Sequence, residues 1–274
     1  MAYTNFKPTI WSRYIQQTLK KFTVLEQGCN HQFRGEVGLG KTVEILTAGR
    51  PTIATYTPGT PIAAPETPAG SKATLAIDQA KYFNFVIDDV DRAQAVEGLM
   101  QALMEEATRG LAEERDAYIA SLAATAAPDM KGDAVAITDA ATAKAQIDAA
   151  LVALYNNGVP TNGGITIYLD PATYVLMKDW VIEYKDSNDR VFDDGVLGVY
   201  SGAKIRMSNN LYESGGALLL PVMTDKAIAF ASCIEKVEAY RPQGDFSDAV
   251  KGLNTFGGKL IRPDELYVIQ KTVG

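Results

Sequence analysis

The sequence predicts an α+β fold from three features that follow one another along the chain. Residues 28–80 are rich in Gly, Thr, Pro and Ala with interleaved β-branched residues, which is typical of extended hairpin structure. A long amphipathic helical pattern follows. Beyond it, two further helices and several short strands share the C-terminal half. Without an internal repeat or a free linker, this mixture predicts two connected subdomains.

Composition limits the classes of protein to which the chain can belong. Its 274 residues, 47% hydrophobic and 22% charged, suffice for one large domain or two modest ones. The net charge of -7 and a lack of basic clusters beyond Lys20-Lys21 argue against a protein that grips nucleic acid through phosphates. No apolar signal segment or membrane-spanning run is present. Cys29 and Cys233 are far apart and are expected to stay reduced.

The N-terminal residues 1–27 are predicted to form an arm that ends in a short amphipathic helix. Pro8 keeps the first part extended. The apolar residues that follow are spaced by three and four, as on one helical face: Trp11, Tyr14, Ile15, Leu19 and Phe22.

The next segment is predicted to be a long hairpin. Residues 42–46, 51–56 and 72–77 alternate as strands do. Between them the sequence reads TPGTPIAAPETPAGS, with four prolines. Since proline suits neither a helix nor a central strand, this stretch is predicted to be an exposed, extended loop.

A dense strand at 82–87 precedes a predicted helix over 90–124. About 35 residues at a rise of 1.5 Å would span roughly 50 Å, which suits the spine of an elongated body. Gly98 and Gly110 each cost such a helix about 1 kcal/mol relative to alanine. Close packing or a bend would explain their presence.

The C-terminal half is predicted to alternate between helices and short strands. One helix covers 139–156, and another begins at Asp170-Pro171, an N-cap followed by proline, and ends near Trp180. A polar loop is predicted over 183–195. The predicted strands are 165–169, 204–207, 217–222, 227–230, 235–240, 255–261 and 266–271.

One short motif suggests nucleotide binding. Gly35 to Thr42 reads GEVGLGKT and fits the phosphate-binding loop G-x-x-x-x-G-K-[ST]. That loop needs a buried strand before it and a helix after it. Here the polar CNHQFR precedes it and a β-alternating run follows. A P-loop NTPase is therefore a remote alternative, and Asp88 and Asp89 are interpreted as helix caps rather than magnesium ligands.

No converging set of catalytic residues is recognisable. His31 is the single histidine, and the sequence has no G-x-S-x-G, H-E-x-x-H or paired CxxC motif. We therefore predict no catalytic, cofactor-binding or metal-binding residues, no cofactor, and no enzyme activity. An arm, a long hairpin and a long helix pack poorly within one chain, which indicates an assembly protein that buries them on neighbours.

Five stretches, taken in order, carry a resemblance to a known family, and the third and the fifth are each quoted in two parts. They are FKPTIWSRYIQQTLKKFTV, then GEVGLGKTVEILTAGRPTIATYTPG, then AIDQAKYFNFVIDDVDRAQA with ERDAYIASL, then DGVLGVYSGAKIRMSNNL, and finally AIAFASCIEKVEAYRP with GLNTFGGKLIRPDELYVI. The chain resembles the major capsid proteins of tailed bacteriophages, the HK97-fold coat protein family. The residues at recurrent positions of the fourth stretch are Gly198, Gly202, Ser208, Asn209 and Asn210.

The resemblance implies an HK97-like capsid fold with an E-loop β-hairpin, a peripheral domain with a spine helix and antiparallel sheet, and an axial α/β domain. The implied boundaries are 1–27 for the N-terminal arm, 28–80 for the E-loop hairpin, 81–135 for the peripheral domain with the spine helix, 136–233 for the axial domain and 234–274 for the closing strands of the peripheral domain.

The resemblance also implies the function. Subunits would form hexamers and pentamers of an icosahedral shell around double-stranded DNA, in a virion assembled in the host bacterial cytoplasm. Residues expected to contact neighbouring subunits are Arg50, Tyr56, Pro58, Pro61, Pro65 and Pro68 in the E-loop, and Phe6, Trp11 and Tyr14 in the arm. An encapsulin-like compartment or a gene-transfer particle is the alternative on the same fold.

The implied partners are further copies of the chain, a portal protein, packaged DNA that is not bound specifically, and in some members a decoration protein. No membrane partner is expected. The resemblance begins within the first residues, without the long helical scaffolding segment of many members, so we expect a separate scaffolding protein.

Overall fold

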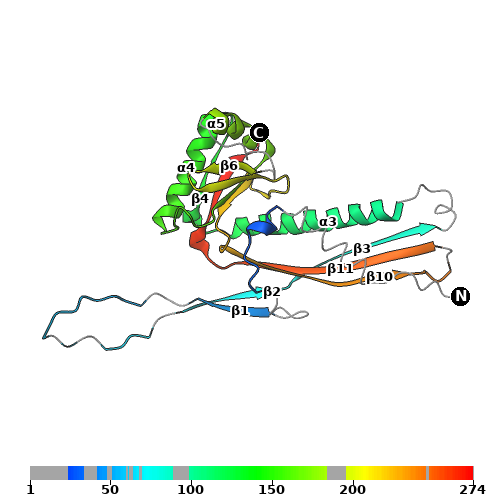
Figure 1. Cartoon of the computed structure of the whole chain (residues 1–274), viewed down its shortest axis with the longest axis horizontal. Coiled ribbons are helices and arrows are strands. Elements are labelled where there is room, and N and C mark those ends of the chain that lie inside the picture. Colours follow the sequence, from blue (N-terminus) through cyan, green and yellow to red (C-terminus); the bar gives the residue numbers. More distant parts are fainter. Residues whose placement is uncertain are drawn as a thin grey trace.

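The computed structural model of the chain describes most of the sequence beyond the N-terminal arm. The described residues are 24–33, 42–47, 51–59, 61, 64–67, 70–88, 99–183, 196–244 and 247–273. The predicted arm up to residue 23, residues 34–41 of the GKT motif and most of the predicted loop at 183–195 lie outside them. The described elements form a helix-and-sheet body, a long helix on a second sheet, and a hairpin that extends away from both (Figure 1).

The body is built on a seven-stranded sheet with two helices. The strand order is β4-β12-β9-β5-β7-β6, and β8 pairs with β9. The β4–β12 and β5–β7 pairs are parallel. The bounds are Lys131–Val135 for β4, Thr166–Leu169 for β5, Val196–Tyr200 for β6, Ala203–Met207 for β7, Glu213–Ser214 for β8, Ala217–Met223 for β9, Leu266–Thr272 for β12, Ala140–Asn156 for α4 and Pro171–Glu183 for α5.

Local sequence explains α4 and the core beneath it. The Asp139 carboxylate accepts a hydrogen bond from the Thr142 backbone N–H at 2.7 Å, which is an N-cap. The predicted apolar face of this helix is confirmed, because Ile147, Leu151 and Leu154 are buried. They pack in one cluster with buried strand residues, among them Ile167, Ile205, Leu220 and Val222.

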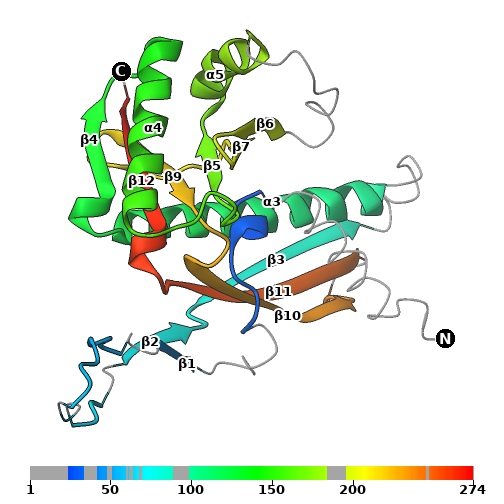
Figure 2. The ribbon, with the colours of Figure 1, turned by 60° about the vertical axis from the view of Figure 1, so that its left-hand side comes forward.

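The second sheet has three antiparallel strands in the order β10-β11-β3. Helix α3 lies along one face of it (Figures 1 and 2). Met104 and Leu111 of the helix pack there against Val237 and Val250. The bounds are Gln79–Asp88 for β3, Leu99–Leu122 for α3, Ile228–Tyr240 for β10 and Ser247–Leu260 for β11.

Strand β10 corrects one prediction. The sequence suggested two strands, 227–230 and 235–240, whereas the structure has a single strand with a register shift between Ile234 and Lys236. A β-bulge lets one strand continue through a stretch whose side-chain alternation is broken. The pattern therefore changes without the strand ending.

Strand β11 corrects a second prediction. The strand expected at 255–261 is the second half of a longer one that begins at Ser247. Gly252 and Gly257 weaken the strand pattern in this stretch. Gly257 is required by packing, because a Cβ atom there would lie 1.9 Å from the backbone oxygen of Ala76.

The hairpin confirms two predicted strands and excludes a third. Strands β1 (Thr42–Thr47) and β2 (Ser71–Ala76) pair antiparallel, close to the predicted 42–46 and 72–77. The strand predicted at 51–56 is wrong, since those residues are exposed and in no strand. The opposite side of the loop is rich in proline, which cannot supply the N–H groups of a ladder.

The helix ends differ in detail from the predictions. Helix α3 is described from Leu99, and its 24 residues span about 36 Å. Helix α5 ends at Glu183 rather than near Trp180. Asp88, expected to cap the spine helix, is the last residue of β3, and Asp89 lies outside the described residues.

A shared core joins the two sheets. Strand β12, in the stretch 234–274 assigned to the peripheral domain, pairs with β4 and β9 of the body. The predicted domain boundaries stay predictions. The cluster at the junction includes Leu25, Tyr168, Phe230, Phe256 and Val268. Short 3-10 turns at Glu26–Gly28 (η1), Ala123–Thr125 (η2), Pro128–Met130 (η3) and Pro263–Glu265 (η4) complete the described fold.

Candidate assembly surfaces

The hairpin packs on the second sheet at its base, and the described residues of its loop are exposed to solvent. Ile45 and Leu75 are buried against Ala229 and Ala231 of β10. On the opposite side of the two strands, Leu46 is 78% exposed. The described part of the loop beyond these strands extends away from the body and from the second sheet (Figures 1 and 2). The base is thus part of the fold, whereas the loop is presented outward.

The described part of the loop exposes apolar side chains to solvent. Ile53 is 81% and Tyr56 66% exposed. The Glu66 carboxylate accepts a hydrogen bond from the Thr52 N–H and so links the two sides of the loop. Hydrogen bonds from Thr52 also lower the pKa of Glu66. This loop carries an apolar surface that its own chain leaves uncovered.

The sequence predicted six contact residues in this loop. Tyr56, Pro58, Pro61 and Pro65 are exposed there. Arg50 and Pro68, like the arm residues Phe6, Trp11 and Tyr14, lie outside the described residues. Contacts of these side chains with other subunits stay predictions.

A buried cluster holds the chain where it leaves the arm. The Asp116 carboxylate of α3 accepts a hydrogen bond from the Val24 N–H at 3.0 Å. Burial raises the pKa of Asp116 to about 6, although hydrogen bonds from the Val24, Leu25 and Glu26 N–H groups act in the opposite direction. Arg115 forms a buried ion pair with Glu26. Sequence reasoning missed this anchor, because Arg115 and Asp116 look like ordinary charges of an exposed helix face.

Arg115 also ties the anchor to the second sheet. Its Nη2 donates a hydrogen bond to Ser232 Oγ at 3.2 Å, and its guanidinium lies 5.3 Å from the centre of the Phe230 ring. His31 Nε2 lies 2.8 Å from the Glu26 carbonyl oxygen. The lone histidine is therefore engaged with η1, and the start of the described chain is fixed to both α3 and β10.

The predicted motif at 198–210 builds a hairpin edge of the body. Ser201 and Gly202 both have positive φ, 51° and 86°, as a tight two-residue turn between β6 and β7 requires. Ser208 is buried, and its N–H donates to the Leu169 carbonyl oxygen at 2.9 Å. The Asn210 N–H donates to Ser208 Oγ at 3.2 Å. These hydrogen bonds and the turn stabilise the fold of the subunit itself.

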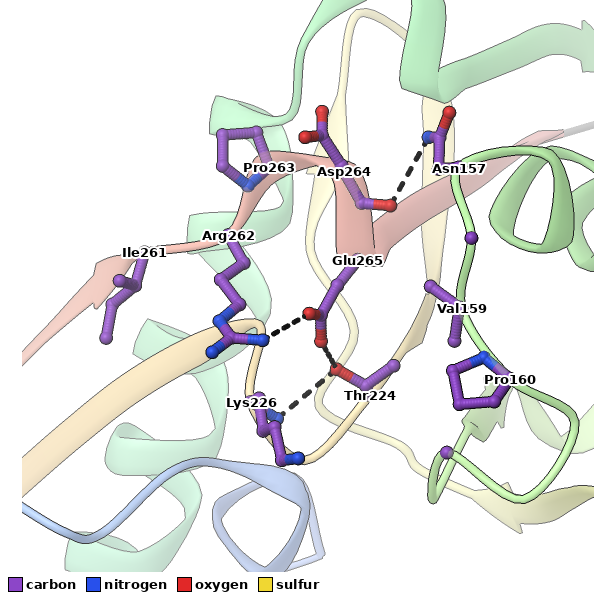
Figure 3. A pocket seen from close by; sticks show the side chains of 12 residues that line it. Asn157, Val159, Pro160, Thr224, Lys226, Ile261, Arg262, Pro263, Asp264 and Glu265 are labelled. Carbon is purple, nitrogen blue, oxygen red and sulfur yellow. Dashed lines mark hydrogen bonds and ion pairs between the residues drawn. The ribbon is translucent and has the colours of Figure 1, made fainter. Parts of the chain in front are cut away.

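A cavity of about 550 Å³ lies where the two sheets meet (Figure 3). Glu265 accepts hydrogen bonds from Arg262 Nη1 at 2.6 Å and from the Thr224 hydroxyl. Asn157 Nδ2 donates to the Asp264 carbonyl oxygen at 3.3 Å. These groups hydrogen-bond one another, so that the turn before β12 is tied to the end of β9 and to the residue that follows α4.

Other chemistry is not indicated in the described part of the chain. Cys29 is buried, and burial raises the pKa of its thiol far above the usual range. Within the described ranges, no group of three or more His, Cys, Asp or Glu residues could hold a metal ion. No helix described here is long and apolar enough to cross a membrane.

The GKT motif does not lead into a helix. Residues 34–41 lie outside the described residues, but Thr42 is the first residue of strand β1. A phosphate-binding loop needs a helix N-terminus at that point. The structural context that would support nucleotide binding is therefore missing on the C-terminal side of the motif.

Comparisons with known proteins identify the class. A chain of the Mycobacterium phage Che8 structure matches with a TM-score of 0.74 and 28% identity, over 90% of this chain and 90% of that one. The capsid of cyanophage P-SCSP1u matches with a TM-score of 0.71 and 18% identity, over 93% and 89% of the two chains. The fold is thus that of phage capsid structures. Comparison with curated proteins gives no match.

The sequence itself matches the family described as "Phage capsid protein" over residues 70–269. The chain belongs to this family, since the match covers more than half of it. It is a major capsid protein that associates with copies of itself into the shell of a virion. The α+β capsid fold predicted from the sequence is confirmed, and the family implies a structural rather than enzymatic role.

Proposed function

We propose that the chain forms the hexamers and pentamers of an icosahedral shell that encloses double-stranded DNA. The observation that carries this proposal is the hairpin: its base is packed on β10, while every described residue of its loop between 51 and 67 is exposed. In a family of self-associating shell proteins, such a loop supplies a contact to the next subunit. A head-to-tail contact of this kind closes into rings.

Two segments would make most of the inter-subunit contacts. The loop would contribute Tyr56, Pro58, Pro61 and Pro65, together with Arg50 and Pro68. The N-terminal arm would contribute Phe6, Trp11 and Tyr14. The buried anchor at Asp116 supports this role for the arm, because it fixes the point from which residues 1–23 depart.

The remaining proposed partners are inferred from the function of a capsid that packages DNA. A net charge of -7 suits a container whose wall does not hold phosphates tightly, so that packaged DNA can enter and leave. We include a separate scaffolding protein and a portal protein among the partners, and place assembly in the host bacterial cytoplasm. A decoration protein would bind the finished shell.

The cellular shells are the competing function on the same fold. A virus-like particle from Pyrococcus furiosus matches with a TM-score of 0.59 at 11% identity, and an empty GTA particle with 0.61 at 10% identity. These likenesses concern the fold alone. The family match favours the phage capsid, and the contents of the purified particle, packaged DNA or a cargo protein, would decide between them.

Electron microscopy of the purified protein, expressed with and without its neighbouring genes, tests the proposal. We expect shells, or six-fold and five-fold rings, in at least one of the two preparations. Shells of uniform size that need a neighbouring gene would support a separate scaffold, whereas uniform shells from this chain alone would exclude that requirement. A small, uniform particle under both conditions would overturn the shell proposal.

A further inference from the structure

The described link between the hairpin and the second sheet is short. Strand β2 ends at Ala76 and β3 begins at Gln79, so two residues, Ile77 and Asp78, join the two strands (Figure 2). The other connection of the hairpin, through residues 34–41, lies outside the described residues. Changes of backbone angle in a link of two residues turn everything beyond it. The direction of the hairpin therefore depends on what holds this link.

Apolar packing at the base of the hairpin does not define that direction. Ile45 and Leu75 of the hairpin pack against Ala229 and Ala231 of β10. The attraction between apolar groups is non-directional, and each alanine presents a single methyl group. This contact holds the hairpin on the sheet but leaves its angle to other interactions.

Two consecutive glycines of β11 admit a close neighbour on each face of the strand. A Cβ atom at Gly257 would lie 1.9 Å from the Ala76 backbone oxygen and 2.9 Å from Ile77 Cα. A Cβ atom at Gly258 would lie 2.8 Å from Leu122 Cδ1 of α3. Since side chains alternate between the faces of a strand, the hairpin link lies against one face and α3 against the other. Only the backbone of β11 separates them here.

The Tyr118 hydroxyl of α3 reaches both the strand and the link. It accepts a hydrogen bond from the Gly258 N–H at 3.2 Å, and it lies 3.3 Å from Asp78 Oδ1 and 3.4 Å from the Gly258 carbonyl oxygen. An edge-to-face contact with Phe256, 5.4 Å between ring centres, orients the tyrosine ring. Burial raises the pKa of Tyr118 and the charge of Asp78 adds to this, so the hydroxyl keeps its proton and remains a donor.

We propose that Tyr118 is a positioning residue that sets the direction in which the hairpin leaves the second sheet. A hydroxyl group has one proton to donate, so the Asp78 carboxylate and the Gly258 carbonyl compete for it. When Asp78 accepts the bond, the link is tied to α3. When Gly258 accepts it, the hydroxyl stays satisfied and water solvates the exposed Asp78, so release of the link costs little.

A hairpin that is biased toward one direction but not locked suits the proposed shell. Hexamers and pentamers place the next subunit at different angles, and the exposed loop would have to meet it in both kinds of ring. This step rests on the proposed function. The direction itself is a property of the single subunit, so it is measured without assembly.

Distances between two spin labels on the unassembled subunit test the positioning role. Ketone-bearing amino acids replace Leu46 of the hairpin and Val175 of α5, which are 78% and 57% exposed, and carry the labels. We expect one narrow distance distribution in the otherwise unchanged chain. Tyr118→Phe keeps the ring but loses the hydroxyl, and should widen the distribution at least twofold. An unchanged width in this variant would overturn the inference.

Variants of the acceptor and a matched control separate the hydrogen bond from a general loss of stability. Asp78→Ala removes the acceptor and should widen the distribution, whereas Asp78→Asn keeps a side-chain oxygen and should not. Tyr155→Phe is the control, because the Tyr155 hydroxyl donates to the Ser201 carbonyl oxygen at 2.7 Å within the body. Equal widening by Tyr155→Phe and Tyr118→Phe, or by Asp78→Asn and Asp78→Ala, would show that this bond does not set the direction.

Electron microscopy of particles formed by the same variants tests the consequence for assembly. We expect Tyr118→Phe and Asp78→Ala to raise the share of tubes and incompletely closed particles at least threefold, and Asp78→Asn and Tyr155→Phe to leave it unchanged. Uniform closed shells from Tyr118→Phe would overturn the role of this residue in assembly. Failure of the wild-type protein to assemble would overturn the proposed function, while the spin-label distances would still decide the positioning role.

Discussion

At the scale of single residues, buried charges determine how the arm is attached. Asp116 and Arg115 lie on the apolar side of α3, where an unpaired charge would be costly. Each has a partner in the segment around η1: Asp116 accepts a hydrogen bond from the Val24 N–H, and Arg115 forms an ion pair with Glu26. The sequence indicated the apolar stripe of the helix but not the contacts of Asp116 and Arg115 with the segment around η1. Interactions between positions about 90 residues apart leave no local pattern in the sequence.

The raised pKa of Asp116 predicts a pH dependence of stability. Its pKa of about 6 in the folded chain exceeds the ordinary 3.8, so between these values the folded state binds more protons than the unfolded state. The contribution of Asp116 to the free energy of unfolding is therefore greatest below pH 4. It decreases by about 3 kcal/mol in all as the pH rises through 6. The substitution Asp116→Asn removes the titrating carboxyl group, so that variant should gain stability relative to the wild type over that range.

Urea unfolding of the unassembled subunits at pH 4, 5, 6 and 7 measures this difference. The difference in the free energy of unfolding between the two proteins at each pH removes the contribution of carboxylates that the substitution does not affect. A wild-type-minus-variant difference that stays constant from pH 4 to 7 would show that Asp116 is not held in the buried environment described here.

At the scale of elements, periodic segments were predictable and irregular ones were not. Helix α4 and strand β9 keep a clear pattern, and their predicted bounds nearly match the observed ones. Strand β11 was half missed because its glycines are chosen by packing rather than by strand propensity. The strand predicted at 51–56 failed because alternation alone cannot supply a partner for the ladder.

Two glycines should respond in opposite ways to the same substitution. In Gly257→Ala the new Cβ would meet the Ala76 backbone oxygen at 1.9 Å, so β11 and the hairpin base must move apart, at a cost of about 1–3 kcal/mol. At Gly110, in the exposed part of α3, nothing lies within 4 Å of a Cβ, so Gly110→Ala should stabilise the unassembled subunit by about 1 kcal/mol. Thermal and urea unfolding of both variants give the two signs, and a neutral Gly257→Ala would refute the close approach.

At the scale of the whole molecule, the fold separates stability from assembly. The seven-stranded body, α3 and the second sheet bury the described core, whereas the hairpin loop contributes none of its described residues to it. The sequence revealed this division through its prolines, which exclude helix and central strand. It could not reveal which side chains share one face of the second sheet, because Tyr82, Lys251 and Tyr240 come together only when β3, β11 and β10 pair.

Shortening the loop should therefore abolish shells without unfolding the subunit. Replacing residues 58–68 by a short Gly-Ser link removes exposed chain, so we expect the melting temperature of the subunit to stay within about 2 °C of the wild type. Shell yield, measured by sedimentation and electron microscopy, should fall at least tenfold because the contact with the next subunit is lost. A Gly-Ser insertion at the exposed Gly215-Gly216 turn, where both residues have positive φ and open space around them, serves as the control for altered chain length. Normal shells from the shortened chain would mean that the loop is dispensable and that α3, the arm or the body edge carries the ring contact instead.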